Sequence, residues 1–176
     1  MIITEEQLKK IAPYSTAQQR NRYLPHLNAV FAGAHINTPL RVAAFLAQLI
    51  HESGSFNYVL ELADGKAYEN RKDLGNTCKG DGVRYKGRGL IQVTGRANYL
   101  RCGQALGLDL LAQPELLEQP EPAVLSAAWF WTTHDCNALA DKSEFNAITR
   151  VINGGYNGMI ERFKLYKCAK KVLGLS

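Results

Sequence analysis

The sequence predicts a mainly α-helical protein that folds as a single domain, residues 1–176, with one small extended region. Apolar residues recur at helical spacing in several segments, and glycine or proline separates these segments. Only residues 85–95 have the composition of a short strand. The 176 residues, of which 46% are hydrophobic and 21% charged, are enough to bury one substantial core without disulfides or metal ions.

Residues 38–54 predict the central helix of this fold. Thr38 is expected to cap the helix, Pro39 suits its first turn, and Gly54 supplies a left-handed stop. Its apolar face consists of Val42, Phe45, Leu46, Leu49 and Ile50. Glu52 falls in the last turn, at the edge of that face. Partial burial and the helix C-terminal carbonyls both disfavour a carboxylate anion, which is the environment that a general acid needs.

Capping and stop signals predict six further helices. Their expected ranges are 4–12, 15–32, 96–107, 122–133, 143–153 and 159–173. Thr4 and Gln7 form a capping box for the first helix, and Pro25 predicts a break in the second. The aromatic run of residues 129–131 is assigned to the core rather than to a sugar-binding surface.

A polar segment, residues 56–86, follows the central helix and lacks sustained periodicity. Irregular runs of this length in a compact domain usually line a functional site. The segment carries two carboxylates of interest, Glu61 and Glu69. The apolar residues of 90–93 then predict a short strand that presents Gln92 and Thr94 on one side. A phosphate-binding glycine loop is excluded, because neither GxGxxG nor a Walker lysine is present.

The charge and the chain ends limit the classes of partner. A net charge of +5 favours an anionic partner, but no zinc finger, RNA-recognition or basic-zipper pattern is present, so nucleic acid is disfavoured. The N-terminus lacks the features of a signal peptide, and no apolar run is long enough to insert stably in a membrane. We therefore expect synthesis in the cytoplasm. The four cysteines, Cys78, Cys102, Cys136 and Cys168, are expected to be reduced there.

An acid at a helix end, two carboxylates in the next loop, and nearby amide and hydroxyl groups together match glycoside hydrolysis. One carboxylic acid protonates the leaving oxygen, and a second carboxylate activates water across a gap of roughly 6.5–9.5 Å in inverting enzymes. Amide and hydroxyl groups then hold the water and the sugar.

The run AAFLAQLIHESGSF, followed by GDGVRYKGRGLIQVTGRANY, SAAWFW and INGG, resembles glycoside hydrolase family 19, and within it the bacteriophage endolysin branch. The resemblance covers roughly residues 40–173. It implies a lysozyme-like helical fold with two lobes, a small extended region and a central cleft. It also implies an inverting mechanism without a cofactor or metal.

The resemblance assigns roles to individual positions. Glu52 matches the general acid of the family. Gln92, Thr94 and Asn98 match polar residues of the family motif that contact water or sugar. Thr94 stands where plant chitinases have the serine that holds the water. Asn153 matches the asparagine of INGG. The base is left open between Glu61, which lies nine residues after the acid as in the endolysin relatives, and Glu69, which matches the plant loop locally. Glu61 is favoured because it lies nearer the end of the helix, and a water held by Thr94 alone is a third possibility.

These observations predict an endolysin-type muramidase that cleaves the β-1,4 glycan bonds of peptidoglycan. Chitinase activity with the same residues is the alternative. A zinc-dependent amidase is a weaker alternative, because the histidines of this sequence do not have the spacing of a metal site. We expect a monomer without a separate wall-binding domain. It would be made in the cytoplasm of a bacterial host, be released through a holin, and act in the periplasm.

Overall fold

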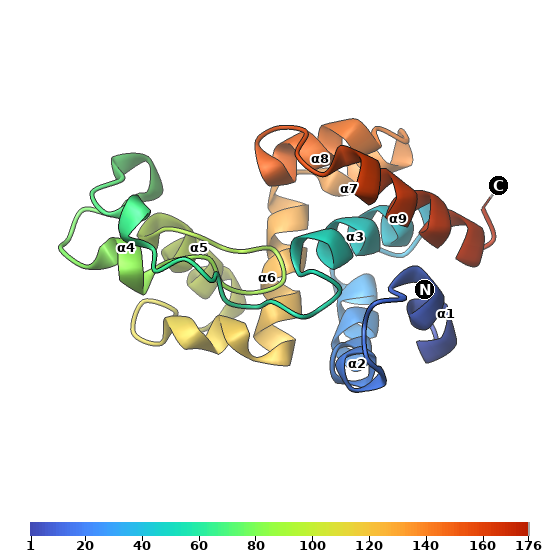
Figure 1. The fold of residues 1–176 in the computed structure, drawn as a ribbon, viewed down its shortest axis with the longest axis horizontal. Helices are drawn as coiled ribbons and strands as arrows, with labels where there is room; N and C mark the ends of the chain where they lie inside the picture. Colours follow the sequence, from blue (N-terminus) through green and yellow to red (C-terminus); the bar gives the residue numbers. More distant parts are fainter. Residues whose placement is uncertain (176) are drawn as a thin grey trace.

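The computed structural model describes residues 1–175 and is mainly helical, as the sequence predicts. Figure 1 shows two lobes joined by the helix α6, Pro120–Thr133. One lobe contains the N-terminal and C-terminal helices, and the other contains the middle of the chain. No helix of the described residues is long and apolar enough to cross a membrane.

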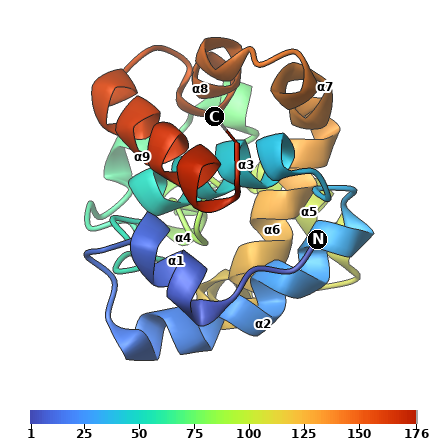
Figure 2. The same ribbon diagram turned by 90° about the vertical axis from the view of Figure 1, so that its right-hand side faces the viewer.

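The larger lobe surrounds α3, Pro39–Glu52. Its other helices are α1 (Glu5–Ile11), α2 (Ala17–Gly33), α7 (Cys136–Asp141), α8 (Phe145–Asn153) and α9 (Met159–Val172). Figure 2 shows α3 enclosed by these helices, and α9 is the one that it contacts most extensively. Every residue of α3 from Val42 to Ile50 is buried. The helix that carries Glu52 is therefore a fixed part of the core.

The predicted start and end of α3 are confirmed. The Thr38 side chain accepts a hydrogen bond from the Arg41 N–H, and Pro39 occupies the first turn. Gly54 follows the helix with a φ of 54°, in the left-handed region. The capping box of α1 is also confirmed, since Thr4 and Gln7 exchange hydrogen bonds between side chain and backbone.

The smaller lobe contains helices and loops, and the predicted strand is absent from its described residues. Its elements are η1 (Lys66–Tyr68), η2 (Lys72–Leu74), α4 (Asp81–Arg84), α5 (Arg96–Leu106) and η3 (Pro114–Glu118). Residues 85–95 form a tight loop, in which Arg88 and Val93 pair through two backbone hydrogen bonds. Gly89 and Gln92 have φ values of 79° and 58°, which interrupt the extended chain. The expectation of a short strand is wrong for this reason.

Several helix boundaries also differ from the prediction. α2 begins after Thr16 and continues through Pro25 without a break. Pro25 removes one backbone donor, but Asn21, whose carbonyl loses its partner, is exposed to solvent. α6 begins at Pro120 rather than Pro122, and α7 was not predicted. α8 begins at Phe145, two residues after its predicted start, and no side chain caps it.

Candidate active site

Glu52 ends α3, and its carboxylate is paired with a buried arginine of α9. The Arg162 guanidinium donates from Nη2 to Glu52 Oε1, although the two residues are far apart in the sequence. The Arg162 side chain is only 1% exposed, whereas that of Glu52 is 18% exposed. The expectation that burial and the helix dipole alone set this environment is therefore incomplete, because a buried cation faces the carboxyl.

The same arginine is held by a second polar contact one turn earlier in α3. Arg162 Nη1 donates to Gln48 Oε1 at 2.5 Å, and Gln48 Nε2 donates to Thr149 Oγ1 at 2.8 Å. Arg162 Nε donates to the Asn157 carbonyl at 3.1 Å. These bonds link α3, α8 and α9 and fix the guanidinium in one orientation. The position of the Glu52 carboxyl is thus set from three helices.

The chain leaves Glu52 through a rare left-handed turn. Gly54, Ser55 and Phe56 have φ values of 54°, 61° and 68°, a conformation that is unfavourable for the last two. The Ser53 hydroxyl accepts a hydrogen bond from the Phe56 N–H at 2.9 Å. The buried Phe56 ring also stacks on Tyr23, with the ring centroids 5.3 Å apart. This turn directs the chain toward Glu61.

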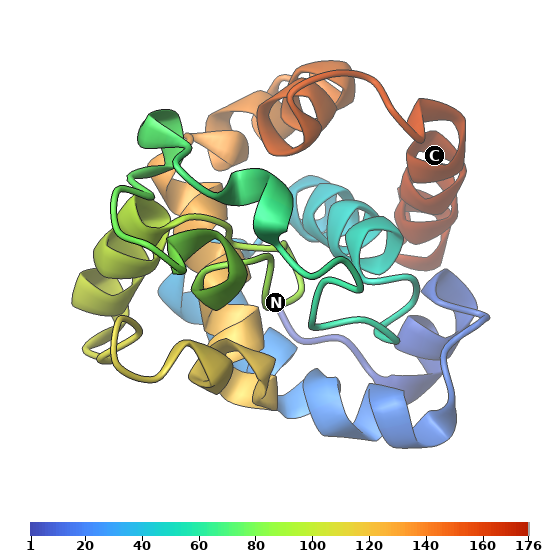
Figure 3. The same ribbon diagram turned by 60° about the vertical axis from the view of Figure 1, so that its left-hand side comes forward.

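Glu61 lies beside the 85–95 loop, and both of its carboxylate oxygens accept hydrogen bonds. The Tyr68 hydroxyl donates to Oε1 at 2.8 Å, and the Gly87 N–H donates to Oε2 at 2.9 Å. The Glu61 N–H donates in turn to the Gly87 carbonyl at 2.9 Å. Burial and the bond to Glu61 raise the pKa of the Tyr68 hydroxyl, which therefore remains a donor. Figure 3 shows residues 54–62 running beside the loop that holds Gly87.

Glu61, Gln92 and Thr94 converge on the α-carbon of Gly87. A β-carbon placed on Gly87 would lie 2.7 Å from Gln92 Oε1, 3.1 Å from Glu61 Oε2 and 3.3 Å from Thr94 Oγ1. Gln92 Nε2 donates to the Gly89 carbonyl at 3.0 Å, which turns its amide oxygen toward this point. The fold thus brings together three of the predicted site residues. Gly87 is required here because it leaves space between their polar atoms.

The two predicted asparagines have different surroundings. Asn98 Nδ2 donates to the Thr94 carbonyl at 2.8 Å, so it supports the loop that carries Thr94. Asn153 ends α8, and its buried Oδ1 has no hydrogen-bond partner among the described residues. An unpaired buried acceptor is costly, and a ligand or water that donates a hydrogen bond would relieve that cost.

Glu69, the other candidate base, contacts a short helix instead of the loop at Gly87. Its Oε1 accepts from the Gly80 N–H at 2.6 Å, and its Oε2 accepts from the Gly82 N–H at 2.9 Å. These donors belong to the first turn of α4, where a carboxylate satisfies free N–H groups. Both oxygens of Glu69 are therefore used within the smaller lobe.

His51 packs against the loop that follows Asn153. A β-carbon on Gly158, whose φ is 70°, would lie 2.3 Å from His51 Cε1 and Nε2. Burial, and secondarily the charge of Arg162, lowers the pKa of His51 below its usual value. The imidazole is therefore neutral at neutral pH.

Sequence reasoning missed Arg162, Tyr68 and Gly87. Arg162 is the fourth residue of a helix with many cations, so nothing in its local pattern distinguishes it from a surface residue. Tyr68 lies seven residues after Glu61 in an irregular segment. The contact of Gly87 with the Glu61 carboxylate depends on the folding of two segments that are distant in the sequence.

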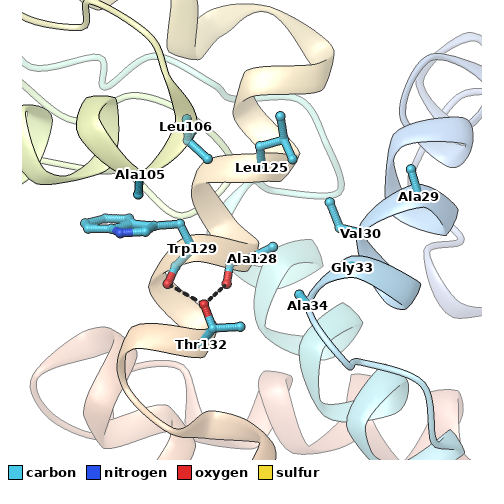
Figure 4. Close-up of a pocket in the computed structure, with 10 residues that line it drawn as sticks. All are labelled: Ala29, Val30, Gly33, Ala34, Ala105, Leu106, Leu125, Ala128, Trp129 and Thr132. Carbon is cyan, nitrogen blue, oxygen red and sulfur yellow. Dashed lines mark hydrogen bonds between the residues drawn. The ribbon is translucent and has the colours of Figure 1, made fainter.

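The described residues contain other features that do not belong to this site. A pocket of about 470 Å³ lies between α2, α5 and α6, and Figure 4 shows that Trp129 and small apolar side chains line it. No group of three His, Cys, Asp or Glu side chains within residues 1–175 is placed to hold a metal ion. All four cysteines are unpaired, and burial raises the pKa of the Cys102 and Cys136 thiols to about 12.

Comparison with solved structures shows the same architecture in known enzymes. Chitinase C from Streptomyces griseus superposes with a TM-score of 0.78 at 27% identity, covering 99% of this chain and 77% of the chitinase. A further bacterial family 19 chitinase superposes with a TM-score of 0.80 at 27% identity, covering 100% of this chain and 97% of that one.

Comparison of sequences gives a consistent result. A Haemophilus influenzae protein named as containing a glycosyl hydrolase family 19 domain is 33% identical, with 95% of each chain covered. An Arabidopsis thaliana endochitinase is 43% identical over 65% of this chain, but the match spans only 39% of that protein. Residues 24–150 match the family described as chitinase class I. The chain is therefore a glycoside hydrolase and belongs to glycoside hydrolase family 19.

Proposed function

We propose that this protein is an endolysin-type muramidase that hydrolyses the β-1,4 bonds of peptidoglycan, with Glu52 as the general acid and Glu61 as the general base. The observation that carries the assignment is the convergence of the Glu61 carboxylate, the Gln92 amide and the Thr94 hydroxyl beside Gly87. This group of acceptors, in which Glu61 lies nine residues after the acid at the end of α3, suits the activation of a water molecule.

In the proposed reaction, Glu52 donates its proton to the glycosidic oxygen as the bond to the anomeric carbon breaks. The Arg162 guanidinium then stabilises the carboxylate that remains on Glu52. Glu61 accepts a proton from a water molecule as the water attacks the opposite face of the sugar. The Thr94 hydroxyl donates to the Gln92 carbonyl at 2.9 Å, so its oxygen is free to accept a hydrogen bond from that water.

Glu61 is favoured over Glu69 as the general base because the two carboxylates have different neighbours. Glu69 occupies both oxygens with backbone donors of α4. Glu61 shares its space with Gln92 and Thr94, which the family resemblance also assigns to the site. We assign Glu69 to the stability of the smaller lobe and Gln92, Asn98 and Asn153 to binding of the sugar or support of that binding.

Peptidoglycan is favoured over chitin by the net charge of +5, which suits an anionic wall polymer. Chitinase activity is the second candidate, since several relatives are named endochitinases. The proposal further includes a monomer that is made in the cytoplasm of a bacterial host and reaches the wall through a holin.

The test is digestion of purified Gram-negative peptidoglycan and, in parallel, of colloidal chitin by the wild type and by Glu52→Gln. We expect the wild type to release disaccharide peptides with a reducing end from peptidoglycan, detected by mass spectrometry, and the variant to release none. Free peptides from intact glycan would instead indicate an amidase. Products from chitin alone would replace the proposal with the chitinase candidate.

A further inference from the structure

A second groove lies directly beside the end of α3. It has a volume of about 470 Å³ and is lined by His51, Gly54 and Ser55, which flank Glu52 in the sequence. The apolar side chains of its lining are Ile11, Pro13, Ile50 and Leu165. Tyr14, at the same groove, is 86% exposed. The groove therefore lies between the end of α3, α9 and the α1–α2 connection, next to the residues that flank Glu52 but without Glu52 in its lining.

Two opposite charges of α9 face this groove without partners. Glu161 and Lys164 both line it, and neither forms a salt bridge or a side-chain hydrogen bond among residues 1–175. Between them in the sequence is Arg162, whose guanidinium contacts Glu52. One helix thus contacts the proposed acid through Arg162 and presents a free anion and a free cation to the groove from another of its faces. A rise of about 1.5 Å per residue separates the two charged residues by roughly 4.5 Å along the helix axis.

The chemistry of this groove fits a short peptide better than a sugar. An uncharged N-acetylated glycan would leave both charges unused. An anionic membrane surface would be attracted by Lys164 but repelled by Glu161. A peptide with small apolar residues, a carboxylate and an amine would place methyl groups on the apolar floor and pair with both charges.

We infer that this groove binds the peptide arm of peptidoglycan, with Lys164 pairing with a carboxylate of the arm and Glu161 with the free amine of its diamino acid. The inference rests on the proposed function. The arm leaves the muramic acid beside the scissile bond, and three extended residues span at most roughly 10 Å. His51, Gly54 and Ser55, which flank Glu52 in the sequence, line the groove, so an arm of this length suits it. The groove would thereby distinguish peptidoglycan from chitin, which has no peptide.

The first experiment compares two forms of one substrate: intact glycan strands with their peptides, and the same strands after an amidase has removed the peptides. For Lys164→Ala we expect kcat/KM to fall about tenfold on the intact strands, as for loss of one charge-assisted hydrogen bond. On the stripped strands we expect a change of less than about twofold. Lys167→Ala, one turn further along α9 and outside the groove, is the matched control.

The second experiment does not depend on cleavage. Cys168 lines the groove, and Cys78 is the only other cysteine that is not buried. In a Cys78→Ser background, a disaccharide-tripeptide fragment should slow the labelling of Cys168 by a thiol reagent, while an N-acetylglucosamine oligomer should not. Lys164→Ala should weaken this protection.

The two experiments separate the possible failures. If the wild type cleaves chitin but neither form of peptidoglycan, the proposed function is wrong, and protection of Cys168 still decides whether the groove binds peptide. If the wild type cleaves both forms and Lys164→Ala affects them equally or not at all, the groove does not bind the arm. Absence of Cys168 protection at saturating fragment would overturn the inference by itself.

Discussion

Glu52 and Glu61 are nine residues apart in the sequence, yet the fold holds them in opposite ways. Glu52 lies on a buried helix and faces a buried cation from the far end of the chain. Glu61 lies on an irregular segment and is held by a tyrosine hydroxyl and a glycine N–H, both uncharged. Burial and the helix C-terminal carbonyls favour the protonated carboxyl of Glu52 before the reaction, whereas Arg162 stabilises the anion that remains once the proton has been given up. A residue that must take up a proton benefits from partners that orient it without competing charge.

The largest expected effect concerns the choice between the two candidate bases. Glu61→Gln should lower kcat by about 10²–10⁴-fold, the usual contribution of a general base. Glu69→Gln should lower the free energy of unfolding by about 1 kcal/mol, since it weakens the bonds to α4. The kcat of Glu69→Gln should remain within a few-fold of the wild-type value. Steady-state kinetics and urea denaturation of both variants check this, and the reverse pattern would make Glu69 the base.

The contribution of the buried cation beside Glu52 can be tested with Arg162→Met, which leaves Glu52 and Gln48 without their buried partner. Removing one member of a buried pair is expected to cost about 3 kcal/mol of unfolding free energy. Glu52→Gln in the same chain should recover part of this loss, because the unpaired charge is then gone. The matched control is Arg41→Met, which breaks the exposed pair with Asp141 and should cost less than about 1 kcal/mol.

Arg162→Met and its double variant are compared by urea denaturation. Additive costs of the two substitutions would show that the ion pair contributes nothing to holding Glu52.

The contribution of the uncharged surroundings of Glu61 can be tested with Gly87→Ala. The added β-carbon would lie 2.7 Å from Gln92 Oε1 and would displace the polar groups around Glu61. We expect kcat to fall by about tenfold to a hundredfold, the cost of a misplacement of about 1 Å. Gly33→Ala, where a β-carbon meets nothing within 4 Å, should keep full activity. Unchanged kcat in Gly87→Ala would mean that this space is not used in the reaction.

The smallest expected effect concerns pH and His51. Its pKa in the folded protein is lowered from the ordinary value of 6.5, mainly by burial. The unfolded chain therefore takes up a proton first, so stability falls as the pH drops below about 6.5. Between roughly pH 7 and pH 5.5, the unfolding free energy of the wild type should fall more steeply than that of His51→Gln. Equal slopes in the wild type and in His51→Gln would contradict the prediction.

Local signals in the sequence were enough to predict the helix that carries the proposed acid. The Thr38 cap, the first-turn proline, the apolar spacing and the Gly54 stop all act within a few residues of one another. The run from Gly87 to Thr94 also identified the family resemblance, which the match over residues 24–150 supports. The extended shape predicted for that run was wrong, because strand propensity cannot report the left-handed conformation of Gln92.

The sequence alone determined the mainly helical class, the place of Glu52 at the end of a buried helix, and the motif that contains Gln92 and Thr94. Only the tertiary structure decided which groups surround the two carboxylates. Arg162 reaches Glu52 because α9 packs on α3, and Gly87 reaches Glu61 because two irregular segments lie side by side. Such contacts join residues that are distant along the chain, and their free energy is gained only when the whole domain is folded. Periodicity and capping signals act within one or two helical turns, so they do not predict these long-range contacts.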